Sequence, residues 1–364
     1  MHHFTFSTSG KITSLAALAV TVSLIASGCS SAESKSGATT AVATSNSCKA
    51  GTTPFSTDDA KDSVNYTDLA TKLGAVPKPK SGVKVGSIMK FLGNQYWIAL
   101  GQGQSKRAAT YNIKVDVQAA ASESDQVGQL NSAETMLQNK YAALMVSPQT
   151  DTNLCAAVEK AEKSGIPVLN VNDAVLPGAQ HWVGPNQIQN GISAAEFVLK
   201  KVPAGGEVAV IQGQAGVYAA QQRTAGFTKT ATDGGLKVVA SVPGDWDVSK
   251  ARDAAATIIK QYPRLTAFYA NNDGMALGIV EAVKAAGMKG KILVIGTDGI
   301  ADAYTAIRSG DMAATVDSYP FLTGQVSVDI ALRLIGGQTV PRAVYTPQAL
   351  ITADNVDATA PTLK

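Results

Sequence analysis

The sequence predicts an α/β protein whose folded part forms two similar lobes, each built on a parallel sheet. Short β-rich runs alternate with amphipathic helical segments from Val83 onward, and this alternation is typical of parallel sheets with helices on both faces. It restarts after residue 184, and two runs of about a hundred residues each predict two lobes. A chain of 364 residues with 33 glycines also suits two domains with many tight strand–helix turns.

An export signal is expected before the fold. Lys11 precedes the apolar run from Leu15 to Ala26, which is short for a membrane-spanning helix but fits a secretory signal. The small residues before Cys29 resemble the lipobox of bacterial lipoproteins, although Ala26 stands where Leu, Val or Ile is usual. We expect residues 1–28 to be a signal peptide and Cys29 to carry lipid. Ordinary cleavage beside an incidental cysteine is the alternative.

Residues 29–82 are expected to hold the lipidated cysteine, a tether and an N-terminal extension. Residues 30–47 are small and polar without periodicity, so they bury too little apolar area to offset the entropy lost on ordering. Cys48 and Cys155 then remain in an oxidising compartment, where an even number of cysteines favours a disulfide. Two unrelated thiols are the alternative.

Charge and apolar content limit the possible partners. The formal net charge is +3, and the basic residues are scattered rather than gathered in a stripe, which indicates that nucleic acid is not a partner. Beyond the signal no stretch is apolar enough to span a bilayer. The mature chain is therefore expected to be exported and to meet the membrane only through its lipid.

The first run of elements covers residues 83–172. β-rich runs predict strands at 83–89, 113–119, 141–147 and 167–172. Between them, helices are predicted at 96–112, 124–139 and 151–165. The second of these helices has one apolar stripe, formed by Val127, Leu130, Ala133, Met136 and Leu137.

The second run begins after residue 184 and repeats the pattern. Helices are predicted at 191–202, 219–235, 248–263 and 273–288. Strands are predicted at 206–213, 236–244, 265–271 and 290–299. The end of the chain adds a strand and a helix within 312–337 and an extended piece at 343–356.

Polar residues stand where the predicted strands end. The strand at 265–271 runs into Asn271, Asn272 and Asp273 before the sequence becomes apolar again. One polar residue can cap the following helix, but three exceed that need. Because ligands bind outside the carboxyl ends of parallel strands, we expect a binding site at this edge. Other predicted strands have similar polar ends, at Ser147, Asn172, Asp173, Asp298, Asp317 and Ser318.

Several segments together resemble the type I periplasmic sugar-binding proteins, the ribose-binding-like receptors of ABC importers. They follow in order across residues 82–355: GSIMKFLGNQYWIALGQG, LMVSPQTD, GIPVLNVNDA, RTAGF, AFYANNDGMALG and VIGTDG. The resemblance implies two flavodoxin-like lobes that close over a ligand about a hinge of three crossing segments. It places residues 83–184 and 318–344 in the N-terminal lobe and residues 185–317 and 345–364 in the C-terminal lobe.

In the first lobe the resemblance implies ligand contacts from three stretches. Asn94, Tyr96 and Trp97 match the family's N-P-F-F segment, whose aromatics sandwich a sugar ring, although Gln95 replaces the usual Pro. The remaining matches are Lys90, Ser147, Asn172 and Asp173, and the Arg that usually accompanies this last pair is absent.

In the second lobe and the hinge it implies five more ligand residues. Arg223 matches a donor to vicinal hydroxyls, and Trp246 matches an aromatic that closes the cleft. Asn272 and Asp298 match hydroxyl binders, and Ser318 replaces Gln or a similar residue at a hinge crossing. The chemistry agrees, because these groups accept from and donate to hydroxyls and aromatic faces pack on C–H groups. Core packing is the alternative for the two tryptophans.

The resemblance implies the substrate-binding component of an ABC importer. It would capture a monosaccharide or sugar alcohol at the outer face of the membrane, as a monomer, and deliver it to a permease with a separate ATPase. A receptor for a hydroxyl-rich quorum or chemosensory signal is the alternative.

Other function classes lack their patterns in this sequence. No nucleophile elbow, phosphate loop or metal spacing appears, and His2 and His3 lie in the expected signal. We therefore expect no enzyme activity, catalytic residue, cofactor or metal. A sugar-responsive repressor would need a helix-turn-helix where the export signal stands.

Overall fold

The structure is a computed structural model that describes residues 62–359. The expected signal peptide, Cys29, the tether at 30–47 and Cys48 lie outside these residues. Among the helices between residues 62 and 359, none combines the length and apolar character that crossing a membrane requires.

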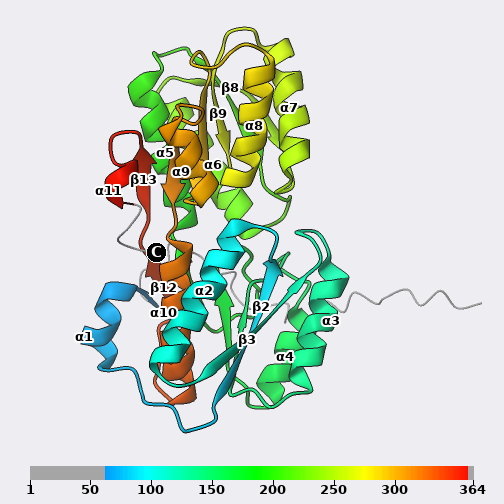
Figure 1. Cartoon of the computed structure of the whole chain (residues 1–364), viewed down its shortest axis with the longest axis vertical. Helices are drawn as coiled ribbons and strands as arrows, with labels where there is room; N and C mark the ends of the chain where they lie inside the picture. The colour runs from blue at the N-terminus through cyan, green and yellow to red at the C-terminus, as the bar shows by residue number, and fades with distance from the viewer. Residues whose placement is uncertain (1–61, 360–364) are drawn as a thin grey trace, which may run out of the picture. The chain divides into compact units, whose positions relative to one another are not determined.

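Seven parallel strands form the first sheet, in the order β1-β12-β6-β5-β4-β2-β3 (Figure 1). The strands are β1 (Ser63–Asn65), β2 (Lys84–Phe91), β3 (Lys114–Ala120), β4 (Ala143–Val146), β5 (Val168–Val171), β6 (Trp182–Pro185) and β12 (Ala343–Thr346). The sheet carries α2 (Gln95–Thr110), α3 (Gln126–Leu137), α4 (Cys155–Lys163) and α10 (Pro320–Ile335). With the short η2 (Tyr66–Asp68) and α1 (Leu69–Leu73), these elements are the first lobe.

Both faces of the first sheet are buried, as the sequence predicts for a parallel sheet. In β2, Val85 and Met89 belong to a core shared with α2 and α10, whereas Ile88 belongs to a core shared with α3 and α4. In β4, Met145 belongs to the first of these cores and Leu144 to the second. Successive side chains of a strand point to opposite faces of the sheet, so each strand contributes to both cores.

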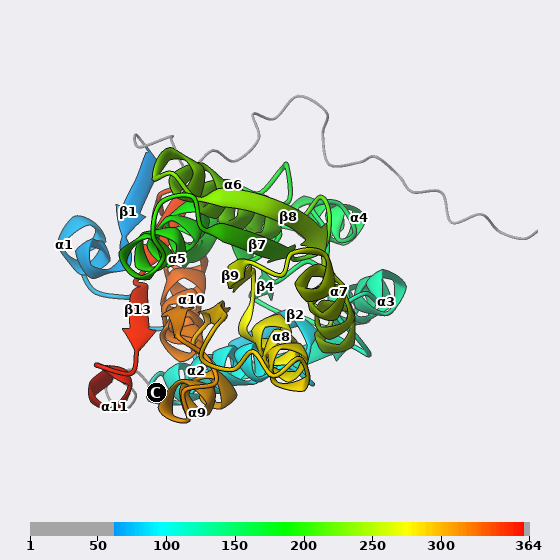
Figure 2. The same ribbon diagram turned by 90° about the horizontal axis from the view of Figure 1, so that it is seen from above.

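Six strands form the second sheet, in the order β13-β11-β10-β9-β7-β8. The strands are β7 (Glu207–Gln212), β8 (Lys237–Pro243), β9 (Leu265–Ala270), β10 (Leu293–Asp298), β11 (Ala314–Asp317) and β13 (Ala349–Thr352). The helices are α5 (Gln187–Lys201), α6 (Tyr218–Asp233), α7 (Val248–Gln261), α8 (Asp273–Ala285), α9 (Ala301–Arg308) and α11 (Val356–Thr359), and Figure 2 shows α7 and α8 side by side. These elements are the second lobe.

Three segments cross between the lobes, as the fold class predicts. They join β6 to α5, β11 to α10, and β12 to β13. The prediction of parallel sheets is wrong for β13, which runs antiparallel to β11. β12 ends at the carboxyl edge of the first sheet and β13 follows after two residues. The chain therefore enters the second sheet at the edge where the parallel strands end, and β13 can only run away from that edge.

The N-terminal extension contributes to the first sheet, which the sequence analysis did not predict. Ser63 pairs with Ala343 and Asn65 with Tyr345, so β1 lies beside β12. Arg333 of α10 donates from Nη2 to the Gly74 carbonyl at 2.9 Å. A strand of three residues gives no readable alternation in sequence, and this one depends on pairing with a strand 280 positions later in the chain.

Cys155 begins α4 and is disulfide-bonded. Cys48 lies outside the described residues, so the pairing of Cys48 with Cys155 stays a prediction.

Glycines allow α2 and α10 to pack at close range, and Figure 1 shows the two helices running side by side. A Cβ atom added at Gly103 of α2 would lie 1.9 Å from the Phe321 carbonyl oxygen, and one at Gly324 of α10 would lie 2.1 Å from the Leu100 carbonyl oxygen. Main-chain atoms cannot rotate away from such a contact. The helices α2 and α10, far apart in sequence, therefore require glycine where they meet.

Gly103→Ala should lower the free energy of unfolding by about 2–3 kcal/mol, because the helices must separate to admit the methyl group. Gly101→Ala is the matched control on the same helix. Its Cβ atom would lie 3.3 Å from Cε of Met89, the movable end of a flexible side chain, and Ala favours a helix over Gly by roughly 1 kcal/mol. Urea unfolding of both variants checks this, and equal losses of stability would contradict it.

Candidate functional site

The carboxyl ends of the parallel strands of both lobes meet at one small cavity. Its volume is about 10 Å³, room for about one water molecule, so a larger ligand can enter only when the lobes move apart. The cavity contains eight of the twelve ligand residues predicted from the sequence, together with one that was not predicted. The wall is formed by Asn94, Tyr96, Trp97, Glu123 and Asp173 of the first lobe and by Arg223, Trp246, Asn272 and Asp298 of the second.

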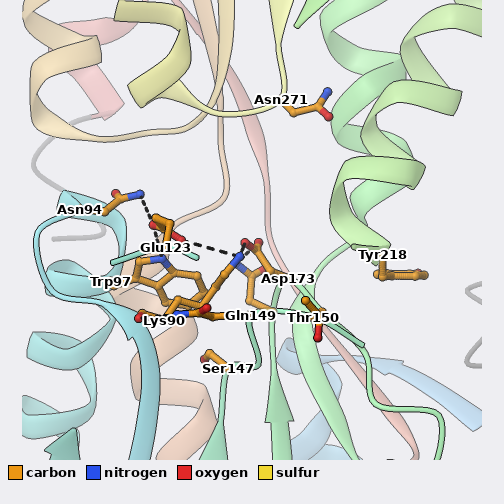
Figure 3. A network of polar contacts seen from close by, with 12 residues as sticks. Lys90, Asn94, Trp97, Glu123, Ser147, Gln149, Thr150, Asp173, Tyr218 and Asn271 are labelled. Carbon is orange, nitrogen blue, oxygen red and sulfur yellow. Dashed lines mark hydrogen bonds and ion pairs between the residues drawn. The ribbon is translucent and has the colours of Figure 1, made fainter. Parts of the chain in front are cut away.

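Two more predicted residues lie directly behind this wall. The fully buried Lys90 donates from Nζ to Oδ2 of Asp173 at 3.1 Å, and Nζ also lies 5.1 Å from the ring centre of Trp246. Asn172 donates to Oδ1 of Asp173 at 3.0 Å and accepts from Gln187 at 2.7 Å. Lys90 and Asn172 therefore each hold one carboxylate oxygen of Asp173 in place. Figure 3 shows Lys90 pointing at Asp173.

The last two predicted residues, Ser147 and Ser318, do not line the cavity. Both are buried. The carbonyl of Ser147 accepts from Gln129 at 2.9 Å, and the hydroxyl of Ser318 accepts from Asn190 at 3.3 Å. Figure 3 shows Ser147 on the far side of Lys90 from Asn271.

Arg223 is the most highly connected side chain of the wall, and its side chain is only 1% exposed. Nε donates to Gln187 at 2.7 Å, and Nη1 donates to the Asn271 carbonyl at 2.6 Å and to Oδ1 of Asp298 at 3.3 Å. Nη2 lies 3.8 Å from Oδ1 of Asp173. Burial opposes the charge, but Asp298 and Asp173 outweigh it and hold the pKa of Arg223 above its ordinary value. The guanidinium is therefore a permanent cation in contact with both lobes.

Three buried polar atoms in the cavity wall have no hydrogen-bond partner among residues 62–359. They are the Tyr96 hydroxyl, Nη2 of Arg223 and Nε1 of Trp246. A buried polar group without a partner costs roughly 1–3 kcal/mol. Three such groups around one cavity indicate that it is built for an occupant with several hydrogen-bonding groups.

The two aromatics of the first lobe pack edge to face, with ring centres 5.0 Å apart. Tyr96 and Trp97 lie in the first turn of α2, which Asn94 caps by accepting from the Tyr96 amide at 2.9 Å. On the other side of the cavity, Trp246 has a φ of 64°, which is unusual for a bulky residue. The backbone is thus strained at the residue that presents this ring to the cavity.

Glu123 is the wall residue that the sequence analysis missed. It follows β3, and one carboxylate oxygen, Oε1, accepts from Nδ2 of Asn94 at 3.0 Å and from Nε1 of Trp97 at 3.2 Å (Figure 3). Burial raises the pKa of Glu123, and nearby Lys90 opposes that shift. The signal was present, because a polar stretch follows the predicted strand at 113–119 just as at the other strand ends.

The polar run after β9 serves three separate purposes. The side-chain oxygen of Asn271 accepts from the Gly213 amide at 2.9 Å, while its carbonyl holds Arg223. Asn272 caps α8 by accepting from the Met275 amide at 2.9 Å and also lines the cavity. Asp273 is fully buried away from the cavity.

Contacts between the lobes also lie outside the cavity. Val217 provides no side-chain cap to α6, but Oδ1 of Asp151 in the first lobe accepts from the Tyr218 amide at 3.4 Å. Elsewhere Gln95 donates to Oδ2 of Asp302 at 2.8 Å and accepts from the Asp302 amide at 3.3 Å. Gln95, where the resembling family has Pro, thus forms a reciprocal pair across the cleft.

The comparisons with known proteins agree with this geometry. Residues 85–339 match the family described as periplasmic binding protein domain. The chain is 35% identical over 243 residues to the D-allose-binding periplasmic protein of Escherichia coli, covering 64% of this chain and 78% of that protein. It is 30% identical to the D-ribose/D-allose-binding protein of Pseudomonas aeruginosa, covering 74% and 89%.

Solved structures show the same fold. An ABC transporter periplasmic solute-binding protein from Actinobacillus succinogenes with bound D-allose has a TM-score of 0.72 and 29% identity, covering 76% of this chain and 99% of that one. An ABC transporter solute-binding protein from Bacillus halodurans with bound myo-inositol has a TM-score of 0.70 and 26% identity, covering 77% and 98%.

Asp273 should make stability depend on pH. One oxygen accepts from the Gly299 and Ile300 amides and the other from the Thr315 hydroxyl, and burial raises the pKa of Asp273 to about 6. The folded protein then holds this proton more tightly than the unfolded chain, so the contribution to stability is full below about pH 4 and is lost as pH rises through 6.

Asp273→Asn keeps an oxygen for both amides and cannot ionise, so it should remove this loss. The difference in free energy of unfolding between this variant and the wild type should shift in favour of the variant by about 1–3 kcal/mol from pH 4 to pH 7. Urea unfolding at both pH values measures the difference. Asp253→Asn, at an exposed side chain, controls for the loss of a negative charge. A difference that does not change with pH would contradict the assignment.

Proposed function

Since this chain belongs to the periplasmic binding protein domain family, we propose that it is the extracytoplasmic substrate-binding component of an ABC importer. It captures a monosaccharide or a sugar alcohol between its two lobes. The observation that carries this proposal is the unpartnered hydrogen-bonding capacity around the cavity, at Tyr96, Arg223 and Trp246. A compact molecule with several hydroxyls satisfies all three.

The composition of the wall supports a neutral, hydroxyl-rich ligand. Asp173 and Asp298 accept from hydroxyls, Arg223 donates to them, and Asn272 has an amide that can do both. Trp97 and Trp246 offer flat apolar faces on which the C–H groups of a sugar ring can pack. The relatives named for D-ribose and D-allose, and the structures with D-allose and myo-inositol, support the same ligand class.

The ligand is bound and released without being altered. The relatives are named as binding proteins, which supports capture rather than turnover and favours import over a signal receptor. Delivery needs a membrane permease and a separate ATPase. We propose that the chain works as a monomer, because the two lobes of one chain supply the whole cavity wall.

A lipid on Cys29 would hold the protein at the outer face of the membrane. The proposal rests on the small residues before Cys29 that follow an apolar run. Cys29→Ser should move the protein from the membrane fraction to the aqueous fraction of cells that produce it. Cys48→Ser is the control, and it should stay with the membrane. A Cys29→Ser protein that remained with the membrane would contradict the anchor.

A ligand screen tests the function directly. The mature protein should be stabilised by at least one of D-allose, D-ribose and myo-inositol, because a ligand that binds only the folded state adds about 2.7 kcal/mol at a hundred times its Kd. Thermal unfolding with each sugar identifies the ligand, and calorimetric titration gives its affinity. Recovering the sugar unchanged after incubation excludes turnover. Failure of all sugars and polyols tried would overturn the proposal.

Variants of the wall serve as controls for the place of binding. Arg223→Ala and Asp298→Ala should each weaken binding by about 1.5–3 kcal/mol, the range for hydrogen bonds to charged groups. Trp246→Phe keeps an aromatic face, removes one donor and should weaken binding less. Arg264→Ala, at an exposed side chain, should change nothing. Unchanged affinity in both Ala variants of the wall would place binding elsewhere.

A further inference from the structure

We propose that Gln95 and Asp302 form a latch that sets how long a bound ligand is retained, whichever sugar or polyol fills the cavity. The pair joins the two lobes without lining the cavity, so it acts on closure rather than on recognition. The inference rests on the proposed function, since it names residues that govern release from the same cavity.

The latch lies outside the cavity and spans the cleft between the lobes. Gln95 is the first residue of α2 in the first lobe, and Asp302 lies in the first turn of α9 in the second. Both line an outer cleft of about 680 Å³, and neither lines the cavity. Because the cavity holds about one water molecule, a ligand is exchanged only when the lobes part, and parting breaks the latch.

Two hydrogen bonds of opposite direction make up the latch. Nε2 of Gln95 donates to Oδ2 of Asp302 at 2.8 Å, and the main-chain amide of Asp302 donates to Oε1 of Gln95 at 3.3 Å. Amides in the first turn of a helix have no partner within it, and Ile300 gives α9 no side-chain cap. Gln95 thus serves as a cap for a helix of the other lobe, which is possible only when the lobes are closed.

The same arrangement occurs at α6. This helix also begins without a side-chain cap, and its first two amides donate to Oδ1 of Asp151 and to the carbonyl of Asp173, both in the first lobe. Figure 3 shows Asn94, which precedes Gln95, and Tyr218, which begins α6, on opposite sides of Asp173. The first lobe therefore completes two helices of the second lobe, one on each side of the cavity, when the lobes close.

The latch should act on the rate of release. In the open protein water replaces both hydrogen bonds, so the latch contributes only a small net difference. It forms after the ligand has entered the open cleft, so its loss should leave the association rate unchanged and make reopening faster. The factor should be the same for every ligand, because the pair lies outside the cavity.

Two single variants and their combination test the latch. Gln95→Ala removes both hydrogen bonds, whereas Asp302→Ala removes one, because its main-chain amide remains. The dissociation rate of D-allose, followed after dilution by tryptophan fluorescence, should rise by about 3- to 10-fold in Gln95→Ala and by about 2- to 3-fold in Asp302→Ala. The double variant should match Gln95→Ala. D-Ribose and myo-inositol should be released faster by the same factors as D-allose.

Two further variants separate the latch from effects on folding. Gln95→Pro lacks the side-chain amide but suits the first position of a helix, so it should release D-allose as fast as Gln95→Ala. Gln102→Ala removes an exposed glutamine of the same helix that does not line the outer cleft, and it should release D-allose at the wild-type rate. Association rates should change by less than about twofold in all of these variants.

The outcomes distinguish the possible failures. Unchanged dissociation rates in both Gln95→Ala and Gln95→Pro would overturn the inference alone. A double variant that releases D-allose much faster than Gln95→Ala would do the same, because the two residues would then act separately. A factor that differs between sugars would indicate contact with the ligand and would also overturn it. Wild-type protein that binds none of these sugars, nor any other sugar or polyol, would overturn the proposed function and this inference together.

Discussion

A buried guanidinium sets the conditions for the whole site. Removing the charge of Arg223 from water is costly and is tolerated only where its hydrogens meet acceptors. Gln187, just beyond the first crossing segment, supplies one acceptor, and the Asn271 carbonyl and Asp298 supply others from the second lobe. Asp173 adds a countercharge from the first lobe. The same cation thus connects the hinge, both sheet edges and the cavity, and it keeps one nitrogen available to a ligand.

The alternation of strands and helices was sufficient to predict the fold, and polar strand ends predicted Asp173, Asn272 and Asp298 of the cavity wall. The other predicted wall residues came only from the resemblance to the sugar-binding proteins. Alternating strands and helices require parallel sheets, and parallel sheets collect polar strand ends at one edge. What local patterns cannot give is the direction of each polar side chain. Ser147, Ser318 and Asp273 obey the same strand-end rule as Asp298, yet they form hydrogen bonds with residues outside the cavity wall. Glu123 obeys the rule as well, because it lies in the polar stretch after the strand predicted at 113–119, and it lines the cavity.

Long-range pairing was likewise beyond the sequence. β1 is a strand only because it pairs with β12, and the direction of β13 depends on where the chain leaves β12. The helix α6 offers a related case, because it begins without a cap of its own and finds acceptors at Asp151 and at the Asp173 carbonyl of the other lobe. Secondary structure at this position is therefore completed by tertiary contact. Because α6 carries Arg223, the contacts that its first turn makes with the other lobe also position Arg223.

The short strand β1 has a consequence for the association of this protein with other chains. An exposed strand edge offers unpaired amides and carbonyls to neighbouring chains, and long flat edges invite aggregation. Among residues 62–359, the first sheet ends beside its crossing segments in three residues that pass at once into a 3-10 turn, and the second ends in the four residues of β13. Edges this short give a foreign strand little to bind. The opposite edges are longer, because β3 and β8 have seven residues each, so this protection applies only to the edges formed by β1 and β13.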